Sequence, residues 1–471
     1  MDTVALIRRP RSVARSAPTT STIHQNPPQA FSLRAAAADI VSDDIAATRL
    51  TELTLNANIT SASPLPASEF SERPTALDLT SLAAPLKAGL EANSLKLTHR
   101  ALLSAVRCGA TSVFIEPEEG LTRLRFRVGR QLREEIAYAD DALFEASAVI
   151  RTLNGNSQTD QALQVSILID GEVHDIQLAP LTTHRADALT LHIDKRIRFA
   201  PTLDELGLSA QALRRLRVIS REQNGLVLLA GECRSGMQLL NYAMLQDLNC
   251  PDLRMISIED RVRLPLPRVA QLTMPTTRDA REALLQSLTL QDPDVISLQR
   301  INERRFFAGL METAAGNRRM IAGVEARTAI RALHRLRSLQ LRLADLAPLL
   351  TGIVSCQVVR TVCPHCKHVH QPLEREQHWV QENFPGTRTQ QDVFVDGEGC
   401  DSCAWTGLGP AKGLYDVVEI NQEMRAAIAV DDIQAFSTAL ALEPGFESLR
   451  QKAFDLARQG EVSLSQAMTV V

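Results

Sequence analysis

The stretch GLVLLAGECRSGMQ, residues 225–238, decides the fold of this chain. An apolar strand over 226–230 runs into Gly231, and Gly236 follows five positions later. This spacing is the G-x-x-x-x-G frame of a phosphate-binding loop, in which a buried strand leads through glycines into a helix. Two glycines at this spacing are weak evidence by themselves, so the interpretation depends on the rest of the chain.

The two positions after the frame lack the chemistry of a working loop. Such a loop continues with Lys, which reaches the phosphates, and then with Ser or Thr, whose hydroxyl holds Mg²⁺. Here those positions are Met237 and Gln238. No lysine occurs between Lys195 and Lys367, so no displaced lysine in this region can replace the missing one.

The composition is that of a globular protein. The chain has 471 residues, of which 45% are hydrophobic and 23% charged, enough for two to four domains. The net charge of −4 does not indicate a nucleic-acid partner. No run of 18 or more apolar residues predicts a membrane-spanning helix.

Periodicity and composition divide the chain into parts. The alternation of strands and helices beyond residue 217 predicts a parallel sheet covered by helices, and therefore an α/β fold. The predicted parts are a mostly disordered arm (1–80), a small α+β domain (83–197), a linker (198–216), the P-loop-type domain (217–360), a cysteine-rich module (361–412) and a C-terminal helical region (413–471).

Two CxxC pairs predict a metal site. Cys363 and Cys366 are separated from Cys400 and Cys403 by 33 residues. Four thiolates in two such pairs suit structural Zn²⁺ in tetrahedral geometry. With four cysteines available, we expect the histidines within 365–370 to lie outside the ligand set.

Further motifs occur in a specific order around the loop. They are LLSAVRCGATSVFIEP (102–117), ISIED (256–260), LTLQDPDVISLQRINE (288–303), VVRTVCPHC (358–366) and GCDSCAWTGLGPAKGLYDVVEIN (399–421). Together they resemble the small domain, acidic box, Walker B region and tetracysteine module of the type II secretion and type IV pilus assembly ATPases. The resemblance covers roughly residues 85–471. It implies a RecA-like parallel-sheet core, preceded by a small α+β domain and followed by a zinc lobe and C-terminal helices.

Measured against that family, the chain departs at several catalytic positions together. The acidic box keeps Glu259 and Asp260, but the Gly-Glu pair of the Walker B region is replaced by Gln299 and Arg300. An arginine at the place of the catalytic glutamate stays protonated and cannot act as a base. The segment 316–328, which resembles the histidine box, contains no histidine.

The resemblance also assigns residues to nucleotide and to a neighbouring subunit. Arg125 and Arg127 match arginines that the small domain of this family directs toward a neighbour's nucleotide, although they would equally suit solvated strand positions. If nucleotide binding is retained, the residues expected to take part are Gly231, Arg234, Ser235, Gly236 and Asp294.

These departures favour a pseudo-ATPase, a structural or regulatory subunit of a secretion or pilus machine in which ATP hydrolysis is weak or absent. The alternatives are an active secretion or pilus motor with an altered site, and a zinc-stabilised scaffold unrelated to secretion. The expected cofactor is structural Zn²⁺, whereas ATP with Mg²⁺ is uncertain. The expected partners are a paralogous ATPase in a homo- or hetero-hexamer and platform proteins of the inner membrane. The expected location is the cytoplasm, or the inner face of that membrane.

Overall fold

The computed structural model describes most of the chain beyond residue 100. The described residues are 101–118, 121–128, 131–138, 163–169, 172–184, 187–196, 199–314, 318–386, 392–403 and 405–470. The predicted arm over 1–80 lies outside them.

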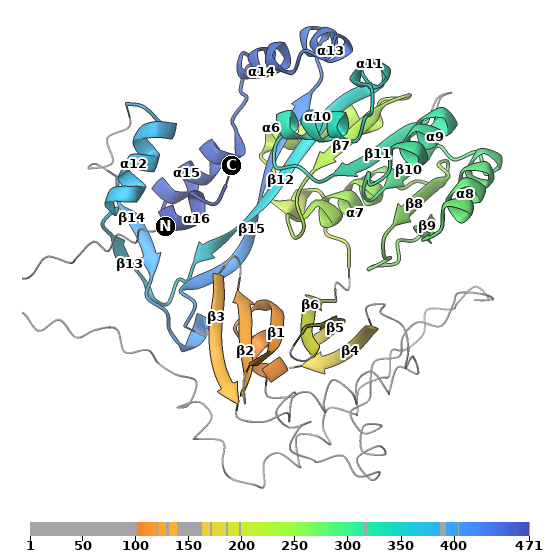
Figure 1. The fold of residues 1–471 in the computed structure, drawn as a ribbon. Coiled ribbons are helices and arrows are strands. Elements are labelled where there is room, and N and C mark those ends of the chain that lie inside the picture. The colour runs from red at the N-terminus through yellow and green to blue at the C-terminus, as the bar shows by residue number, and fades with distance from the viewer. Residues whose placement is uncertain are drawn as a thin grey trace, which may run out of the picture.

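The small domain is built on one antiparallel sheet of six strands in the order β3-β2-β1-β6-β5-β4 (Figure 1). Alternate residues such as Val113, Ile115, Leu124 and Phe126 are buried on one face, as a half-exposed sheet requires. β1 and β2 are consecutive in the chain and pair antiparallel, so they form a hairpin. The strands are β1 (Ala110–Glu118), β2 (Leu121–Val128), β3 (Gln131–Tyr138), β4 (Leu163–Ile169), β5 (Glu172–Thr182) and β6 (Asp187–Lys195).

The core domain has a second sheet of seven strands in the order β15-β12-β7-β11-β10-β8-β9. All neighbouring pairs run parallel except β12 with β15, which confirms the predicted α/β fold with a parallel sheet. β7, the strand that leads into the loop, is buried along its whole length. The strands are β7 (Leu226–Ala230), β8 (Met255–Glu259), β9 (Val269–Thr273), β10 (Val295–Leu298), β11 (Arg319–Val324), β12 (Leu350–Val362) and β15 (Leu408–Glu419).

Helices cover both faces of this sheet. Alternate residues of β7 point to opposite sides, so Val227 and Leu229 join one apolar cluster while Leu226 and Leu228 join another. The first cluster includes side chains of α6 (Ala210–Arg221) and α7 (Met237–Leu248). The second includes side chains of α8 (Arg278–Leu290), α9 (Arg304–Ala314), α10 (Ala329–Ser338), α11 (Leu343–Leu346), α13 (Gln422–Ala429) and α14 (Ile433–Ala441).

The long strands β12 and β15 extend from the core domain into a third lobe, which lies to one side of the core domain in Figure 1. The predicted boundaries at 360 and 412 fall inside these two strands, so the backbone is continuous across both. Phe384 stacks on Phe454 with ring centroids 4.3 Å apart inside this lobe. Its other elements are β13 (Lys367–His370), α12 (Glu374–Asn383), β14 (Phe394–Gly397), the short η3 (Asp401–Cys403), α15 (Leu449–Arg458) and α16 (Leu464–Ala467).

Among the described residues, no helix combines the length and the apolar character that a bilayer crossing requires.

Burial in the second core cluster predicts a strong contrast between two leucines. Leu310 of α9 is fully buried, whereas Leu290 at the end of α8 is 85% exposed. Leu310→Ala is expected to lower the free energy of unfolding by about 2–5 kcal/mol, because it leaves a cavity. Leu290→Ala, the matched control, is expected to change it by less than about 0.5 kcal/mol. Equal losses in urea denaturation would contradict the described packing.

Candidate nucleotide site and metal centre

The loop that follows β7 has the backbone shape of a phosphate loop. Gly236 has φ of +88° and caps the start of α7, a conformation that favours glycine. Arg234 also has a positive φ, of +65°. The chain therefore passes through two left-handed residues before the helix begins, as in a tight strand-to-helix turn.

The inside of this loop is filled by its own side chains. A Cβ on Gly231 would lie 2.2 Å from Ser235 Oγ and 2.9 Å from Cys356 Sγ. Ser235 is buried, and its hydroxyl contacts Cys356 Sγ of β12 at 3.6 Å. Gly231, Ser235 and Gly236 lie in this one loop, and the hydroxyl of Ser235 is turned toward the sheet; their assignment to nucleotide stays a prediction.

Met237 is part of the hydrophobic packing. Its side chain packs against the cluster on the α7 side of the sheet and reaches β11, where its Cε lies 3.1 Å from the position of a Cβ on Gly323. A lysine here would carry a charge toward bound phosphates. The methionine instead fills space between the helix and the sheet.

Gln238 belongs to a buried polar network around Glu259. Glu259 is 1% exposed, and its Oε2 accepts a hydrogen bond of 2.5 Å from the hydroxyl of Tyr242. Ser257 and Gln271 donate to its other oxygen at 2.9 Å, and Gln238 lies 3.4 Å from Oε2. Burial, followed by the charge and hydrogen bond of Glu259, raises the pKa of Tyr242. All four donors to this carboxyl group are neutral side chains.

The side chain of Arg300 lies between two acidic side chains, at the edge of the sheet where the parallel strands end. Asp260, Arg300 and Glu325 each follow the end of one of the adjacent parallel strands β8, β10 and β11. The Arg300 guanidinium lies 3.1 Å from Asp260 Oδ2 and 2.8 Å from Glu325 Oε1. The backbone amide of Asp260 also donates a hydrogen bond of 2.7 Å to the side-chain oxygen of Gln299. One guanidinium of the chain itself therefore binds both carboxylates and compensates one of their two negative charges.

Both charged side chains inside the loop are also bound. Arg327 donates to Glu232 at 2.6 Å. Arg234 leaves the core domain and donates to the carbonyl oxygen of Thr111 at 2.8 Å, with Ser112 Oγ at 3.3 Å. Arg234, which the sequence assigned to nucleotide, thus contacts β1 of the small domain.

Asp294 lies away from the loop, and the structure corrects its assignment to the nucleotide. It precedes β10, where its carboxylate accepts from the amide of Arg254 at 2.7 Å. β10 and β7 run in the same direction, and β11 pairs with both of them. Traced through β11, Ala230 at the end of β7 lies five residues beyond the level of Val295 at the start of β10. At about 3.3 Å per residue this is about 16 Å. A residue before one parallel strand and a loop after another lie at opposite edges of the sheet.

Arg125 and Arg127 of β2 are engaged within their own domain. Arg125 forms an ion pair with Glu116 of β1, and the Arg127 guanidinium lies 5.3 Å from the centroid of the Phe114 ring. Their assignment to a neighbouring subunit's nucleotide stays a prediction.

The four predicted cysteines converge. The Sγ atoms of Cys363, Cys366, Cys400 and Cys403 all lie within 4.8 Å of one another, with the shortest separations at 3.8 and 3.9 Å. Four sulfurs placed tetrahedrally at 2.3 Å from Zn²⁺ would be about 3.8 Å apart. Amides of Gly399 and Gly407 donate to two of the sulfurs at 3.3 and 3.2 Å. The geometry and donor set fit zinc, and this cluster contains no histidine ligand.

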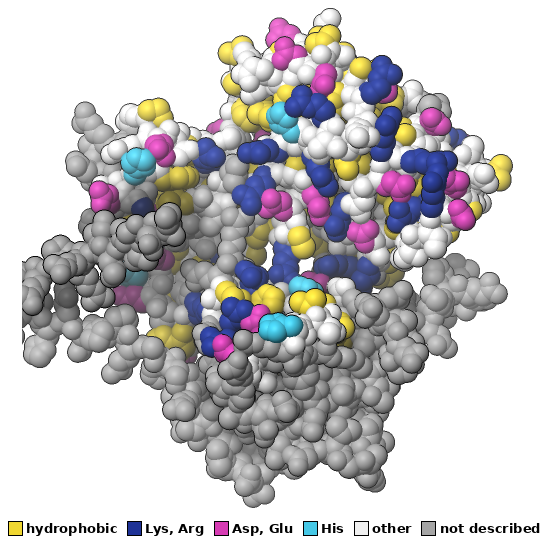
Figure 2. Space-filling view, viewed as in Figure 1, with side chains coloured by type: hydrophobic (Ala, Val, Ile, Leu, Met, Phe, Trp, Pro, Cys, Tyr) yellow, Lys and Arg dark blue, Asp and Glu magenta, His cyan; other side chains and the backbone are white. Residues whose placement is uncertain are grey.

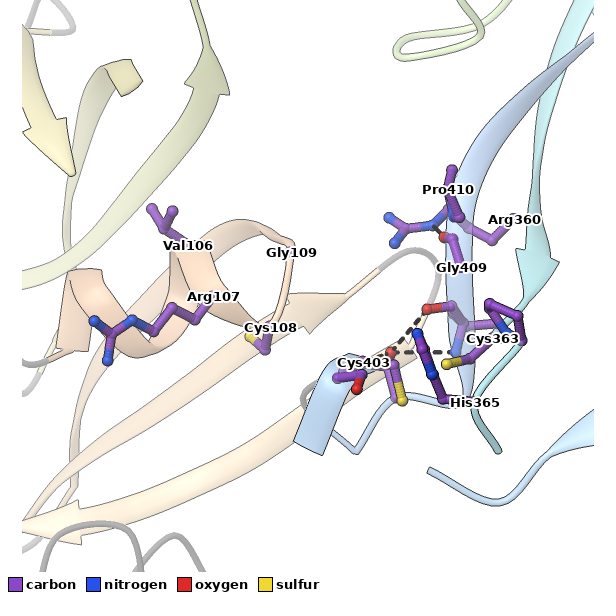
Figure 3. A pocket seen from close by; sticks show the side chains of 14 residues that line it. Val106, Arg107, Cys108, Gly109, Arg360, Cys363, His365, Cys403, Gly409 and Pro410 are labelled. Carbon is purple, nitrogen blue, oxygen red and sulfur yellow. Dashed lines mark hydrogen bonds between the residues drawn. The ribbon is translucent and has the colours of Figure 1, made fainter. Parts of the chain in front are cut away.

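A cavity of about 400 Å³ separates the metal cluster from the small domain (Figure 3). On one side lie Arg107 and Gly109, at the end of the helical residues 101–107. On the other side lie Arg360, Cys363 and His365, and Arg360 donates to the carbonyl oxygen of Gly409 at 2.7 Å. This cavity therefore lies between the small domain and the lobe that contains the cysteine cluster.

Sequence reasoning missed Glu325 and Arg327, which lie in the segment that resembles the histidine box. Both follow β11, the strand next to β7, so their position beside the loop could have been inferred from the parallel order. It also missed Arg261 and Arg263, because their partners lie in the other domain.

Comparison with known proteins decides the family. A family model described as type II/IV secretion system protein matches residues 90–469. The chain belongs to this family. In the secretion family, the type II secretion system ATPase E of Vibrio cholerae is 24% identical over 387 residues, covering 81% of this chain and 76% of that protein. The type IV pilus assembly ATPase PilB of Thermus thermophilus is 23% identical over 390 residues, covering 80% of this chain and 43% of that protein.

Two solved ATPase structures share the fold. The ATPase DotB of Legionella pneumophila superposes with a TM-score of 0.55 at 12% identity, covering 79% of this chain and 95% of that one. The DotB structure of Yersinia pseudotuberculosis gives a TM-score of 0.54, covering 87% and 99%. At this identity the likeness shows the fold alone.

The network around Glu259 predicts the effect of removing one hydroxyl. Tyr242→Phe is expected to lower the free energy of unfolding by about 1–3 kcal/mol, because a buried carboxyl oxygen loses its closest donor. Tyr415→Phe is the matched control, since the hydroxyl of this buried tyrosine has no hydrogen-bond partner within the described part of the chain. Equal effects in denaturant titrations would contradict this role of Tyr242.

The cysteine cluster predicts zinc in the purified chain. We expect one zinc ion per chain by elemental analysis, and loss of that zinc with a lower unfolding temperature in Cys400→Ser. Cys250→Ser lies outside the cluster and is expected to keep the metal. Full zinc content in Cys400→Ser would show that the cluster is not the metal site.

Proposed function

We propose that this chain is a pseudo-ATPase of the secretion family, a structural or regulatory subunit that keeps the motor fold but does not hydrolyse ATP at a useful rate. The observation that carries the proposal is Arg300, which bridges Asp260 and Glu325 at the carboxyl edge of the sheet. Phosphoryl transfer depends on cations that neutralise phosphate charge and on a group that positions the attacking water. A bound guanidinium takes the acids from Mg²⁺ and supplies no base.

The loop supports the same conclusion independently. Met237 packs against the sheet, and Gln238 lies close to Glu259, so neither side chain is directed to phosphate or metal. Removal of one group that stabilises transition-state charge costs about 10²–10³ in rate. Such effects do not simply multiply when groups act as a unit. Several losses in one site nevertheless leave little basis for turnover.

The proposed role is mechanical. The sheet, the small domain and the lobe with the cysteine cluster are all present. The chain would therefore keep the contact surfaces of a motor subunit while lacking ATP hydrolysis. We propose that it joins a homo- or hetero-hexamer with a paralogous ATPase, at the cytoplasmic face of the inner membrane. There it would contact platform proteins of a secretion or pilus system, with Zn²⁺ stabilising its third lobe. Arg125 and Arg127 are the candidates for contact with the neighbouring subunit.

An active motor with an altered site is the alternative. It is favoured by the retained loop backbone, with Gly236 at the start of α7, and by the buried Glu259. Amides at a helix start bind anions, so some affinity for ATP without Mg²⁺ is compatible with either function.

The proposal predicts no ATP turnover above background in the purified chain, measured as phosphate release. Restoring the family's groups with Met237→Lys, Gln238→Thr and Arg300→Glu is expected to raise the affinity for ATP with Mg²⁺ by about tenfold or more. This corresponds to about 1.5–3 kcal/mol for hydrogen bonds to charged groups. Calorimetry with and without Mg²⁺ measures this gain.

The matched control is Glu259→Gln, which keeps the shape of the buried side chain. Turnover by the unaltered chain that Glu259→Gln abolishes, with the fold maintained, would establish the active motor and refute the proposal.

A further inference from the structure

The side chains of three arginines of the core domain contact the small domain. They lie at the carboxyl edge of the sheet, where a nucleotide would bind. Arg234 lies in the loop, while Arg261 and Arg263 follow the acidic box at the end of β8. The carboxyl edge of the sheet faces the small domain, and Figure 2 shows Lys and Arg side chains gathered along this boundary. Each arginine has a defined acceptor on the other side.

The three contacts lie on three different strands. Arg234 donates to the Thr111 carbonyl oxygen of β1 at 2.8 Å. Arg261 lies 3.2 Å from the carboxylate of Asp175 on β5, and Arg263 lies 3.2 Å from that of Asp194 on β6. Three separate points of attachment fix the rotation of the small domain as well as its distance.

Asp175, the acceptor for Arg261, is also held by side chains of its own small domain. It is buried, and it also binds Arg196 at 2.5 Å and Ser166 at 2.7 Å. Burial alone would raise its pKa, but these hydrogen bonds and the charges of Arg196 and Arg261 hold the pKa of Asp175 below its usual value. Asp175 therefore offers a charged acceptor at neutral pH.

The space among these groups is too small for a phosphate. The cavity enclosed by Asp175, Asp194, Arg196, Arg261 and Arg263 measures about 10 Å³. That is room for about one water molecule. The small domain also borders the lobe that contains the cysteine cluster, across a cavity of about 400 Å³. The three arginines provide direct polar contacts between the small domain and the core domain.

We propose that these arginines form a nucleotide-independent clamp, which holds the small domain closed against the core domain. The chain's own guanidinium–carboxylate pairs supply the charge contacts between the domains, without a bound nucleotide. A subunit closed in this way keeps one shape while neighbouring subunits pass through their own states. The inference goes beyond the absence of hydrolysis, because it concerns domain orientation.

The test measures the distance between two spin labels by pulsed electron resonance on the full chain. One label replaces Leu181 of β5 and the other replaces Leu290 of α8, which are 65% and 85% exposed. The background carries serine in place of the cysteines outside the metal cluster that are not fully buried, Cys108, Cys233 and Cys250. The clamp predicts one narrow distance distribution that Mg²⁺-ATP leaves unchanged.

Removal of the clamp is expected to open the domains. The variant Arg234→Ala/Arg261→Ala/Arg263→Ala should shift the distribution outward and broaden it. The matched control removes three arginines whose ion pairs lie within the core domain, Arg278, Arg281 and Arg305, and should leave the distribution unchanged. No shift in the first variant, or an equal shift in both, would overturn the clamp.

A charge swap tests one pair without depending on the triple variant. Arg263→Asp places two carboxylates together and should broaden the distribution, and adding Asp194→Arg should restore it. Failure of either step would contradict a direct role for this pair. An inward or outward shift of the unaltered chain on adding Mg²⁺-ATP would also overturn the clamp. That result is distinct from failure of the proposed function, which is read from phosphate release.

Discussion

The pairing of β7 between β11 and β12 is the constraint on which the rest of the structure depends. β7 is buried throughout and hydrogen-bonded on both sides, so its end has a fixed position at the carboxyl edge of the sheet. The loop and α7 start there. The parallel neighbours bring Asp260, Arg300 and Glu325 to the same edge. The partner on the other side, β12, continues beyond its pairing with β7 and leads into the first two cysteines of the cluster, Cys363 and Cys366.

Charge compensation by the chain's own side chains characterises that edge of the sheet. Each acid in the region has an internal partner: Glu232 binds Arg327, Asp260 and Glu325 bind Arg300, and Glu259 binds neutral donors. A nucleotide with Mg²⁺ would have to displace these contacts. Charge pairing within the chain also crosses the domain boundary, where Arg261 and Arg263 form ion pairs with Asp175 and Asp194.

Much of the fold could be predicted because it depends on local patterns. The strand over 226–230 follows from its apolar run and agrees with the structure, as does the alternation of strands and helices beyond residue 217. The four cysteines needed only their spacing. The long strands β12 and β15 were missed as a pair, since antiparallel pairing between residues 350–362 and 408–419 is a non-local choice. Asp294 was misplaced because its motif does not show which end of a strand it occupies.

The sequence by itself determined the family, the class of fold, the four clustered cysteines and the absence of a lysine after the loop. These depend on residue identity and on spacing along the chain. Only the tertiary structure decided what the substituted residues do. It showed that Met237 packs against the sheet, that Arg300 bridges two acids, and that Arg234 contacts the small domain. The physical reason is that a charged side chain is defined by its partner, and these partners come from strands that are distant in sequence and adjacent in the sheet.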